Sequence, residues 1–380
     1  MTSFHHQLKI MSVMKKAKLG NENASEIPEH LILEHILPRL PVKSLLRFKT
    51  VSKIWLSSIS APAFQKSHLR LSSYAPKFLL SHVDDDDRKI FLLSYDESKT
   101  ILSDLVHLNS NILSEQSDHF YPIGSCNGLL CWYHEPLDSF TIWNPATRHC
   151  KKILGYSETT DQVTFHEVFD AYGFGYVSST HDYKILVMYL SSHIQGFGYF
   201  YLYSLNTGTW STLNYLDGMY YARSLCSITA VYMDDTLYWA FRNQTTGALV
   251  GIIGFDLVTD QMNPVQQIPW LCNYMSVDQI FKMEGCLSLC CSKGRNLDSD
   301  IWMLKQQGNP KTWSKLFSID CKMTPVLDFT ENGKYLVQHS GQLKLIDPVE
   351  EDAHHSTNGI DCHDEILGTG SKYVESLISF

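Results

Sequence analysis

The chain has 380 residues, of which 44% are hydrophobic and 19% charged, so it is long enough for one large globular domain and a small one. Its net charge is −9 and no concentrated basic patch is visible, so we expect no nucleic-acid partner. No stretch reaches the roughly 18 apolar residues of a membrane helix, and the N-terminus lacks the apolar core of a signal peptide, so we expect no membrane partner either.

The cysteines indicate the compartment. The chain has 10 cysteines, and several of them, such as Cys126 and Cys131, lie in apolar runs typical of strands, where a free cysteine behaves as a small hydrophobic residue. Cys290 and Cys291 are adjacent in such a run, so their side chains should point to opposite faces of a sheet. This pattern predicts free thiols and a reducing location in the cytosol or the nucleus.

The pattern of polar and apolar residues changes twice along the chain. Residues 1–24 are polar and aperiodic, which predicts a disordered N-terminal extension. Residues 25–71 have helical periodicity, whereas residues 74–380 alternate short apolar runs with clusters of Gly, Asn, Asp and Ser. The sequence therefore predicts an α+β multidomain protein with a small helical module followed by a large all-β domain.

Three apolar stripes separated by prolines predict three helices in the module. The first helix begins near Pro28 and stops at Pro38, and Pro41 starts the second. The apolar members of the three stripes are Leu31, Ile32 and Ile36; Val42, Leu45 and Leu46; and Val51, Ile54, Trp55 and Ile59. A unit this small cannot bury all of them by itself. Either the β domain or the helices of a partner cover the surplus, and the periodicity leaves both readings open.

The segment LPVKSLLRFKTVSKIW, from Leu40 to Trp55, resembles the core of the F-box, and Pro28 corresponds to the leading proline of that family. The resemblance implies a three-helix module that docks a Skp-type adaptor protein, which in turn holds a cullin scaffold. The residues that it implies for adaptor binding are Pro28, Leu31, Ile36, Leu40, Pro41, Val42, Leu45, Leu46, Val51 and Trp55.

Internal repeats organise the β domain. A polar turn followed by an apolar strand recurs in steps of 48 to 55 residues, at Asn127, Asp182, Asp235, Glu284 and Asn332. A second series, in which an apolar strand runs into a turn, interleaves with the first at Trp143, Tyr203, Phe255 and Leu345. The tripeptide Thr-Trp-Ser also occurs twice, at 209–211 and 312–314, about two periods apart.

Repeats of about 50 residues with three or four short strands are typical of propeller blades of the kelch kind. Five periods lie between residues 120 and 350, and residues 77–106 supply a further blade. A final strand over residues 373–378 is expected to return and close the ring, which protects the sheet edges. We therefore predict an all-β propeller of about six blades; a pair of β-sandwiches is the alternative.

This half also resembles a known family. The segments GSCNGLLC, IWNPATR, YGFGY followed by DYKIL, LYSLNTGTW, LYWA and YVESL resemble, in order, the F-box-associated domain of plant F-box proteins. With the F-box, the resemblance implies the substrate-recognition subunit of an SCF-type (Skp–cullin–F-box) E3 ubiquitin ligase, which holds an unidentified target protein and catalyses nothing itself. A role in pollen–pistil recognition is one subtype of this reading. Residues 350–370 are interpreted as a polar loop inserted before the last strand.

Catalytic motifs are missing from the sequence: it has no G-x-S-x-G elbow, no phosphate-binding loop and no H-E-x-x-H helix. We interpret Gly173-Phe-Gly-Tyr as turn glycines between strands. His354, His355, Cys362 and His363 lie in a polar stretch without a C-x-x-C framework, so we expect no metal and no cofactor. The alternative function is a propeller enzyme or a small-ligand-binding protein, which would need converging polar groups at the mouth of the central channel.

Two further predictions concern the β domain. Six tryptophans, most of them at repeat-equivalent strand positions, are expected to pack between blades, with a ligand cage as the alternative: Trp132, Trp143, Trp210, Trp239, Trp302 and Trp313. Target-binding residues are not encoded by a motif and are expected in irregular loops on one face of the propeller, with 159–167, 191–198 and 215–223 as the candidate segments.

Overall fold

The chain forms two compact units, residues 1–71 and 72–380, in the computed structural model. The structure describes residues 27–72, 76–83, 88–108, 120–134, 137–156, 168–191, 198–213, 229–242, 249–263, 266–274, 276–293, 298–305, 312–319, 326–339, 341–349, 359–362 and 366–380. The N-terminal extension predicted to be disordered lies outside these residues.

The first unit is helical. Helix α2 (Glu29–Leu31) runs on through a π-helical turn, η1 (Ile32–Ile36), and a 3-10 turn, η2 (Leu37–Arg39), and is followed by α3 (Val42–Phe48), α4 (Lys53–Ser60) and α5 (Pro62–Ser72). The continuous segment from α2 to η2, helix α3 and helix α4 correspond to the three apolar stripes. Helix α5 is an addition to the three expected helices, and its sequence PAFQKSHLRLS has too few large apolar residues to form a clear stripe.

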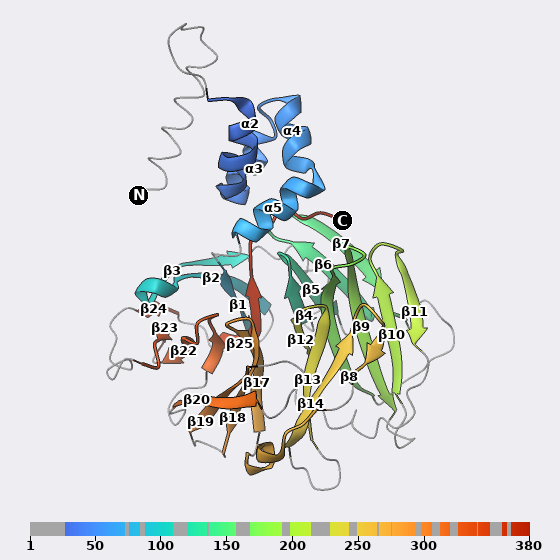
Figure 1. Ribbon diagram of the computed structural model, residues 1–380, viewed down its shortest axis with the longest axis vertical. Coiled ribbons are helices and arrows are strands. Elements are labelled where there is room, and N and C mark those ends of the chain that lie inside the picture. Colours follow the sequence, from blue (N-terminus) through green and yellow to red (C-terminus); the bar gives the residue numbers. More distant parts are fainter. Residues whose placement is uncertain are drawn as a thin grey trace, which may run out of the picture. The chain divides into compact units, whose positions relative to one another are not determined.

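The second unit is a propeller of six antiparallel sheets, which confirms the predicted fold class (Figure 1). Blade 1 is built from β1 (Lys77–Val83), β2 (Arg88–Asp96), β3 (Ile101–Leu108) and the C-terminal strand β25 (Ile366–Tyr373); η3 (Glu97–Lys99) follows β2. Blade 2 contains β4 (Phe120–Cys126), β5 (Leu129–His134), β6 (Ser139–Asn144) and β7 (His149–Leu154). Blade 3 contains β8 (Val168–Val177), β9 (Asp182–Ser191), β10 (Gly198–Ser204) and β11 (Thr209–Leu213).

The remaining three blades follow the same plan. Blade 4 contains β12 (Val231–Met233), β13 (Thr236–Arg242), β14 (Leu249–Asp256), β15 (Gln261–Met262) and β16 (Gln266–Gln267), and η6 (Pro269–Asn273) leads onward. Blade 5 contains β17 (Ser276–Met283), β18 (Cys286–Ser292), β19 (Ser299–Leu304) and β20 (Trp313–Ile319). Blade 6 contains β21 (Val326–Phe329), β22 (Tyr335–His339), β23 (Gln342–Ile346) and β24 (Gly359–Asp361).

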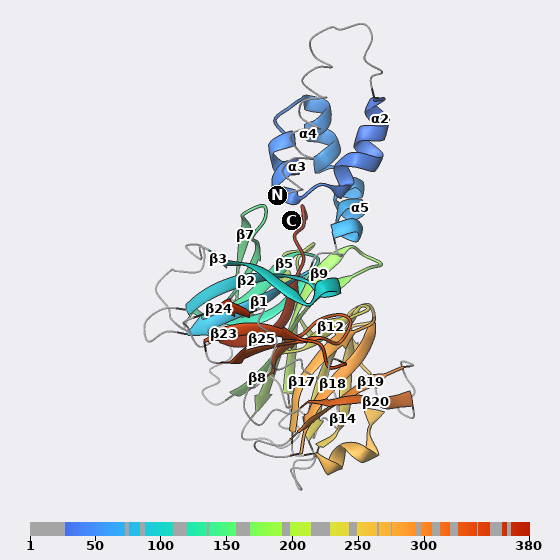
Figure 2. The same ribbon diagram turned by 90° about the vertical axis from the view of Figure 1, so that its left-hand side faces the viewer.

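The ring is closed by the C-terminal strand. Strand β25 pairs with β1 and lies at the edge of blade 1, beside β1 in Figure 2. It also contacts β4, β17 and β21, the first strands of blades 2, 5 and 6. The prediction placed this strand at 373–378, but it ends at Tyr373 and the following residues have no regular structure. The polar loop expected over 350–370 is also shorter than predicted, because β24 and the start of β25 occupy part of it.

Six apolar clusters fill the propeller, and each lies between two neighbouring blades. Alternation along each strand feeds two clusters at once: in β5, Leu129 and Cys131 face blade 3, whereas Leu130 and Trp132 face blade 1. All six tryptophans belong to these clusters or pack against them, which confirms their predicted role. Cys290 and Cys291 belong to different clusters, as the strand pattern predicted.

The two repeat series correspond to two sets of turns. The first series forms the turns between the first and second strands of blades 2 to 6, where pairs such as Glu284 and Gly285 have φ of 50° and 72°. Two successive positive φ values are typical of the type I′ turn, which matches the twist of a hairpin. The second series forms the turns after the third strand of a blade. The repeat period is therefore the blade, as predicted.

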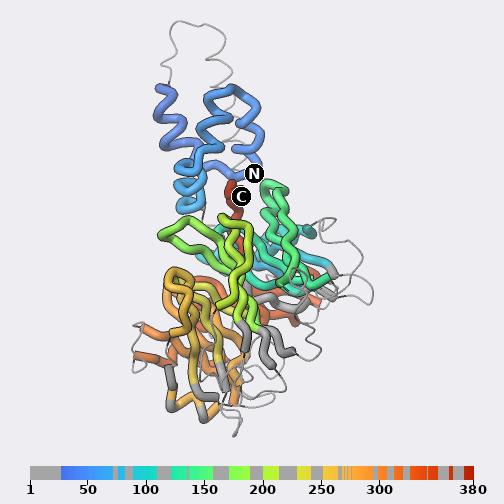
Figure 3. The backbone as a smooth tube through the Cα atoms, turned by 90° about the vertical axis from the view of Figure 1, so that its right-hand side faces the viewer, coloured from blue at the N-terminus to red at the C-terminus, as the bar shows by residue number. Residues whose placement is uncertain are grey.

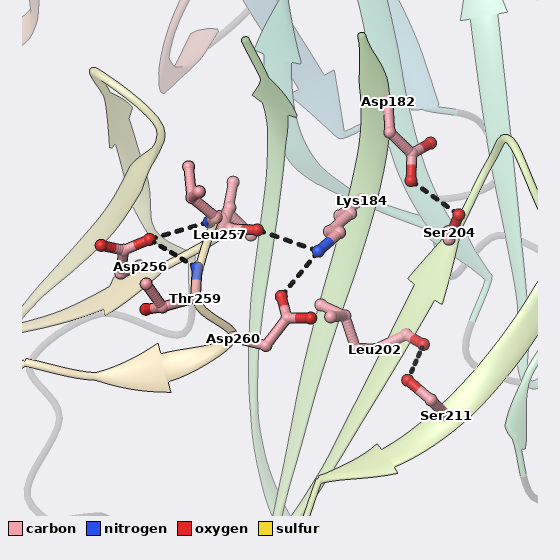
Figure 4. A network of polar contacts seen from close by, with 10 residues as sticks. Asp182, Lys184, Leu202, Ser204, Ser211, Asp256, Leu257, Thr259 and Asp260 are labelled. Atoms are coloured by element: carbon pink, nitrogen blue, oxygen red, sulfur yellow. Dashed lines mark hydrogen bonds and ion pairs between the residues drawn. The ribbon is translucent and has the colours of Figure 1, made fainter. Parts of the chain in front are cut away.

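A side-chain oxygen caps each turn of the second series that the structure describes. Figure 4 shows the turn of blade 4. Asp256 Oδ1 accepts hydrogen bonds from the backbone N–H groups of Val258 at 2.8 Å and Thr259 at 3.0 Å. Lys184 of blade 3 then reaches this turn of blade 4, donating from Nζ to Leu257 O at 2.9 Å and Asp260 Oδ1 at 2.6 Å. Turn chemistry and blade-to-blade attachment therefore coincide at this edge of the propeller.

The glycines of YGFGY are not turn residues, which corrects the prediction. Gly173 and Gly175 lie inside β8, where a Cβ atom would be 2.5 Å from the side chains of Leu237 and Tyr232 respectively. Both neighbours belong to blade 4. The missing side chains allow blade 4 to pack directly on the backbone of blade 3.

Candidate functional site

The helical unit has a small but complete core. Leu37, Val42, Leu45 and Ile59 are at most 1% exposed. Ser52 caps α4 by accepting a hydrogen bond from the backbone N–H of Trp55 at 3.1 Å, which fixes the start of the helix that carries Ile59.

One aromatic pair and one histidine contact complete this core. The Trp55 ring packs edge-on against Phe48, with ring centroids 5.5 Å apart. His68 of α5 is 1% exposed, and its Nε2 lies 2.9 Å from the carbonyl oxygen of Leu40. The fourth helix therefore secures the Leu40–Pro41 junction between the first and second helical segments.

The same unit leaves large apolar side chains on its surface. Their exposed fractions are 46% for Ile27, 38% for Leu31, 45% for Val51, 55% for Ile54 and 47% for Leu56. We call these five residues the apolar surface of the helical unit. On α4, Ile54 and Leu56 flank the buried Trp55, so the helix is apolar on its outer side as well as on its core side. A helix that is apolar over most of its circumference is typical of one that is covered on both sides.

The ten residues predicted for adaptor binding divide into three groups. Pro28, Leu31, Pro41 and Val51 are exposed; Ile36, Leu40 and Leu46 are half-buried; Val42, Leu45 and Trp55 are buried. The buried three stabilise the unit from inside and present little surface to any partner, because a short bundle needs their side chains as its core. The assignment of the others to adaptor binding stays a prediction.

The ten residues predicted for adaptor binding do not include Ile27, Ile54 or Leu56. The sequence did contain an indication for two of them, because Ile54 and Leu56 are apolar residues directly before and after Trp55, outside the core stripe of Trp55 and Ile59. Charge adds a second property that the motif alone did not indicate. Residues 27–72 contain seven Lys or Arg residues and two Glu residues, although the whole chain carries a net charge of −9. The surface of this unit therefore favours a partner that is apolar and acidic.

The segments proposed for target binding attach to one edge of blade 3. In that blade, Val168 pairs with Ser191, Gly198 pairs with Leu190, and Leu213 pairs with Phe200. These pairs place the start of β8, the end of β9, the start of β10 and the end of β11 at the same edge, opposite the recurrent turns. Residues 159–167, 192–197 and 215–223 lie outside the described residues, so their target-binding role stays a prediction.

The inner strands contain one unusual carboxyl group. Asp328 of β21 is 1% exposed, and its Oδ1 accepts hydrogen bonds from Gln279 Nε2 at 3.3 Å and Phe329 N at 2.7 Å. Burial raises its pKa to about 6, although Lys372 nearby acts in the opposite direction. Among the described Asp and Glu side chains it is the single one with a raised pKa, and one carboxyl group is not the converging set that the enzyme alternative requires.

A second buried carboxylate, Asp300 of blade 5, is fully paired. It accepts hydrogen bonds from Tyr274 Oη at 2.6 Å and Ser318 Oγ at 2.8 Å, and it forms ion pairs with Lys315 at 2.8 Å and Lys293 at 3.1 Å. Burial acts to raise its pKa, but the hydrogen bonds from Lys315 and Tyr274 outweigh burial and hold the pKa below its usual range. This arrangement stabilises the blade and leaves no free acid for chemistry.

Metal ligands do not gather in the described part of the chain. Within the described ranges, no group of three or more His, Cys, Asp or Glu residues is arranged to hold a metal ion. His354, His355 and His363 lie outside those ranges, and Cys362 is buried in the cluster between blades 6 and 1. The residues that the structure describes also contain no helix that is long and apolar enough to cross a membrane. The seven described cysteines are free thiols.

Comparison with known proteins identifies the family of the propeller, and its relatives are named F-box proteins. Residues 79–365 match the family described as "F-box associated beta propeller domain". The F-box/kelch-repeat protein At3g23880 of Arabidopsis thaliana is 29% identical over 298 residues, covering 76% of this chain and 78% of its own. F-box protein At4g22390 of the same plant is 25% identical over 381 residues, covering 93% of this chain and 90% of its own. F-box protein CPR1, also of Arabidopsis thaliana, is 27% identical over 307 residues, covering 76% and 72%.

Solved structures resemble the propeller only distantly. Oligogalacturonate lyase from Vibrio parahaemolyticus is 12% identical with a TM-score of 0.39, and the similarity covers 72% of each chain. Similarity at this level supports no inference about activity.

Proposed function

The chain belongs to the F-box associated β-propeller family, and on that premise we propose that it is the substrate-recognition subunit of a Skp–cullin–F-box ubiquitin ligase. In this proposal the helical unit binds a Skp-type adaptor, the adaptor binds a cullin scaffold, and the propeller binds a target protein. The observation that carries the proposal is the apolar surface of the helical unit, since five large apolar side chains remain exposed on a unit that already has a core.

The chemistry of this surface defines the adaptor face that would fit it. An apolar centre would cover Leu31, Val51 and Ile54, and carboxylates at its rim would pair with the lysines and arginines of the unit. Removing apolar area from water supplies most of the binding free energy, while the charges mainly speed the encounter. A Skp-type adaptor is proposed because the segment from Leu40 to Trp55 has the F-box pattern.

The proposed mechanism is proximity. Tethering the target beside a charged ubiquitin-conjugating enzyme raises the effective concentration of its lysines, and it requires no acid, base or nucleophile from this chain. We propose that the unknown target binds the propeller edge that carries the segments 159–167, 191–198 and 215–223, because the opposite edge is occupied by short capped turns. We place the complex in the cytosol or the nucleus, where the free thiols stay reduced.

The test compares two exposed apolar residues in different units. Ile54→Asp introduces a carboxylate into the apolar surface, and Leu154→Asp makes the same change at a residue of the propeller that is 62% exposed. If the helical unit binds the adaptor through this surface, Ile54→Asp should weaken binding of a purified Skp-type adaptor by about 2–4 kcal/mol, or at least about 30-fold. Leu154→Asp should bind as the unmodified chain does.

Titration calorimetry of the full chain measures both affinities, and circular dichroism verifies that each variant is folded. Because Leu45 is buried, a change there would unfold the unit and would not test the surface. Failure of the unmodified chain to bind any Skp-type adaptor would overturn the proposal, and equal affinities of the two variants would move the adaptor site away from Ile54.

A further inference from the structure

The last seven residues of the chain, Val374–Phe380, run onto blade 2 after the closing strand β25 ends in blade 1. They form no helix or strand, yet Ser376 and Leu377 are only 0% and 1% exposed. The three views of the chain place the C-terminus beside the hairpin of β6 and β7 (Figures 1, 2 and 3). A segment without regular structure that is this well buried must be held by specific contacts.

Asn144, at the end of β6, supplies the largest set of these contacts. Its Nδ2 donates hydrogen bonds to Ile378 O at 2.8 Å, Ser376 O at 3.1 Å and Ser376 Oγ at 3.4 Å. Its Oδ1 accepts from the backbone N–H groups of Ala146 at 3.0 Å and Thr147 at 3.4 Å, which caps the following turn. One fully buried side chain therefore joins the C-terminal segment to a turn of blade 2.

Only an amide performs both tasks. The equivalent turn of blade 4 is capped by Asp256, whose carboxylate accepts from two backbone N–H groups in the same way (Figure 4). A carboxylate at 144 would cap the turn equally well, but its second oxygen would face the carbonyl oxygens of Ser376 and Ile378 with no proton to donate. The choice of Asn at this position follows from the segment it holds.

Gly128, in the turn between β4 and β5, is the second contact. A Cβ atom at this position would lie 2.4 Å from Ser376 Oγ and 2.5 Å from Val374 O, and the residue has φ of 79°. Gly285 occupies the equivalent turn of blade 5 with φ of 72° and has nothing within 4 Å of its virtual Cβ. The positive φ explains a glycine at both positions, whereas the close approach of the C-terminal segment is specific to Gly128.

Other contacts attach the segment to blade 1 and to both sides of blade 2. Lys77 of β1 forms an ion pair with Glu375 at 2.7 Å, and the ring of Tyr373 packs in the cluster between blades 1 and 2. Ile378 packs against the cluster between blades 2 and 3. The segment thus contacts blade 1, blade 2 and the far side of blade 2.

We infer that Val374–Phe380 is a latch that locks the closed propeller, and that Gly128 and Asn144 are the residues that hold it. Closure then has two separate parts: β25 completes blade 1 by backbone pairing, and the latch ties that blade to blade 2. Two of the most recognisable segments of the sequence, NGLL and WNPAT, serve this latch and are not available for target binding.

The first experiment compares two glycines with the same backbone strain. In the full chain, Gly128→Ala and Gly285→Ala both place a side chain at positive φ, but only Gly128→Ala displaces the latch. We expect Gly128→Ala to melt on the order of 5 °C below Gly285→Ala. Ser379 and Phe380 are exposed in the folded chain, so the informative step is removal of the residues before them. Carboxypeptidase should release Ile378 and Leu377 on the order of 10-fold faster from Gly128→Ala, because their cleavage reports local opening.

A second pair covers the case in which Gly128→Ala does not fold. Asn144→Asp keeps the turn cap and removes the donors to the latch, while Asp256→Asn makes the reverse change at a turn without a latch. We expect faster C-terminal release for Asn144→Asp and an unchanged rate for Asp256→Asn. Equal release rates within both pairs would refute the latch, and so would melting temperatures of the two glycine variants within about 1 °C of each other.

Discussion

The helical unit and the propeller solve the same problem in opposite ways. Both contain more apolar side chains than a single layer of structure can bury. The propeller closes on itself, so that each blade covers the next and six clusters take up its apolar faces. The helical unit ends after α5 with Ile54 still 55% exposed. In the described part of the propeller the exposed large apolar side chains, such as Leu154, Val258 and Val349, are spread over different blades, whereas five lie between residues 27 and 56 of the short bundle. The difference favours the helical unit as the half that depends on a partner.

The largest expected loss of stability tests whether the helical unit has a core that is distinct from its surface. Leu45→Ala removes a side chain that is 0% exposed and should cost about 2–5 kcal/mol, which is enough to unfold so small a unit. Leu46→Ala, at a half-buried position next to it, should cost about 1 kcal/mol or less. Urea unfolding followed by far-UV circular dichroism separates the helical transition from that of the propeller. Similar losses for the two variants would mean that the unit has no defined core.

A second prediction concerns the buried carboxyl group of the propeller. Its folded pKa is about 6 against a usual 3.8, so between about pH 4 and pH 6 the folded state retains a proton that the unfolded state has lost. The contribution of Asp328 to the free energy of unfolding should therefore be most favourable below about pH 4, and it should be lost as the pH rises through about 6. Asp328→Asn should remove this dependence and stabilise the propeller at neutral pH by about 1–3 kcal/mol.

Melting temperatures of both proteins across that pH range test the prediction. Around Asp328, Lys372 favours the charged form and Glu331 disfavours it, while Gln279 donates to Oδ1. Asp278→Asn, at an exposed position on the neighbouring strand β17, is the control and should leave the pH profile as it is. A profile of Asp328→Asn that follows the unmodified chain would show that another group titrates.

The smallest expected effect tests how much polar ties add to blade packing. Lys184→Met breaks the link from blade 3 to Leu257 and Asp260 of blade 4 (Figure 4). Because Asp260 is 37% exposed, water screens the pair and the cost should be about 0.5–1 kcal/mol. Urea unfolding of the propeller measures it. A loss as large as that of Leu45→Ala would mean that polar ties, and not the apolar clusters, hold neighbouring blades together.

Much of the fold was predictable because local chemistry repeats with the blade. The turn pairs at Asn127 and Glu284, and the alternation along β5, each depend on a few neighbouring residues, so period and blade number followed from the sequence. The six tryptophans followed for the same reason. The role of the glycines of β8 was not predictable, because glycine is needed there to let Leu237 and Tyr232 of another blade pack close to the strand.

The candidate site was predictable in part. The F-box pattern indicated the segment from Leu40 to Trp55. A pattern does not distinguish residues that are buried in the core from residues that are exposed on the surface. Leu45 and Ile54 both fit an apolar stripe, and one is 0% exposed and the other 55% exposed. The difference depends on how three short helical segments pack together, which periodicity alone does not specify.

By itself the sequence determined the order of the parts: a helical module with the F-box pattern, then blades of about 50 residues, then a C-terminal segment that returns to the first blade. These features are local, since propensity, turn residues and alternation act over a few positions. Only the tertiary structure decided which residues meet across long separations, such as Asn144 with Ile378 and Gly128 with Ser376. Contacts of that kind depend on ring closure, which brings residues more than 200 positions apart into one interface.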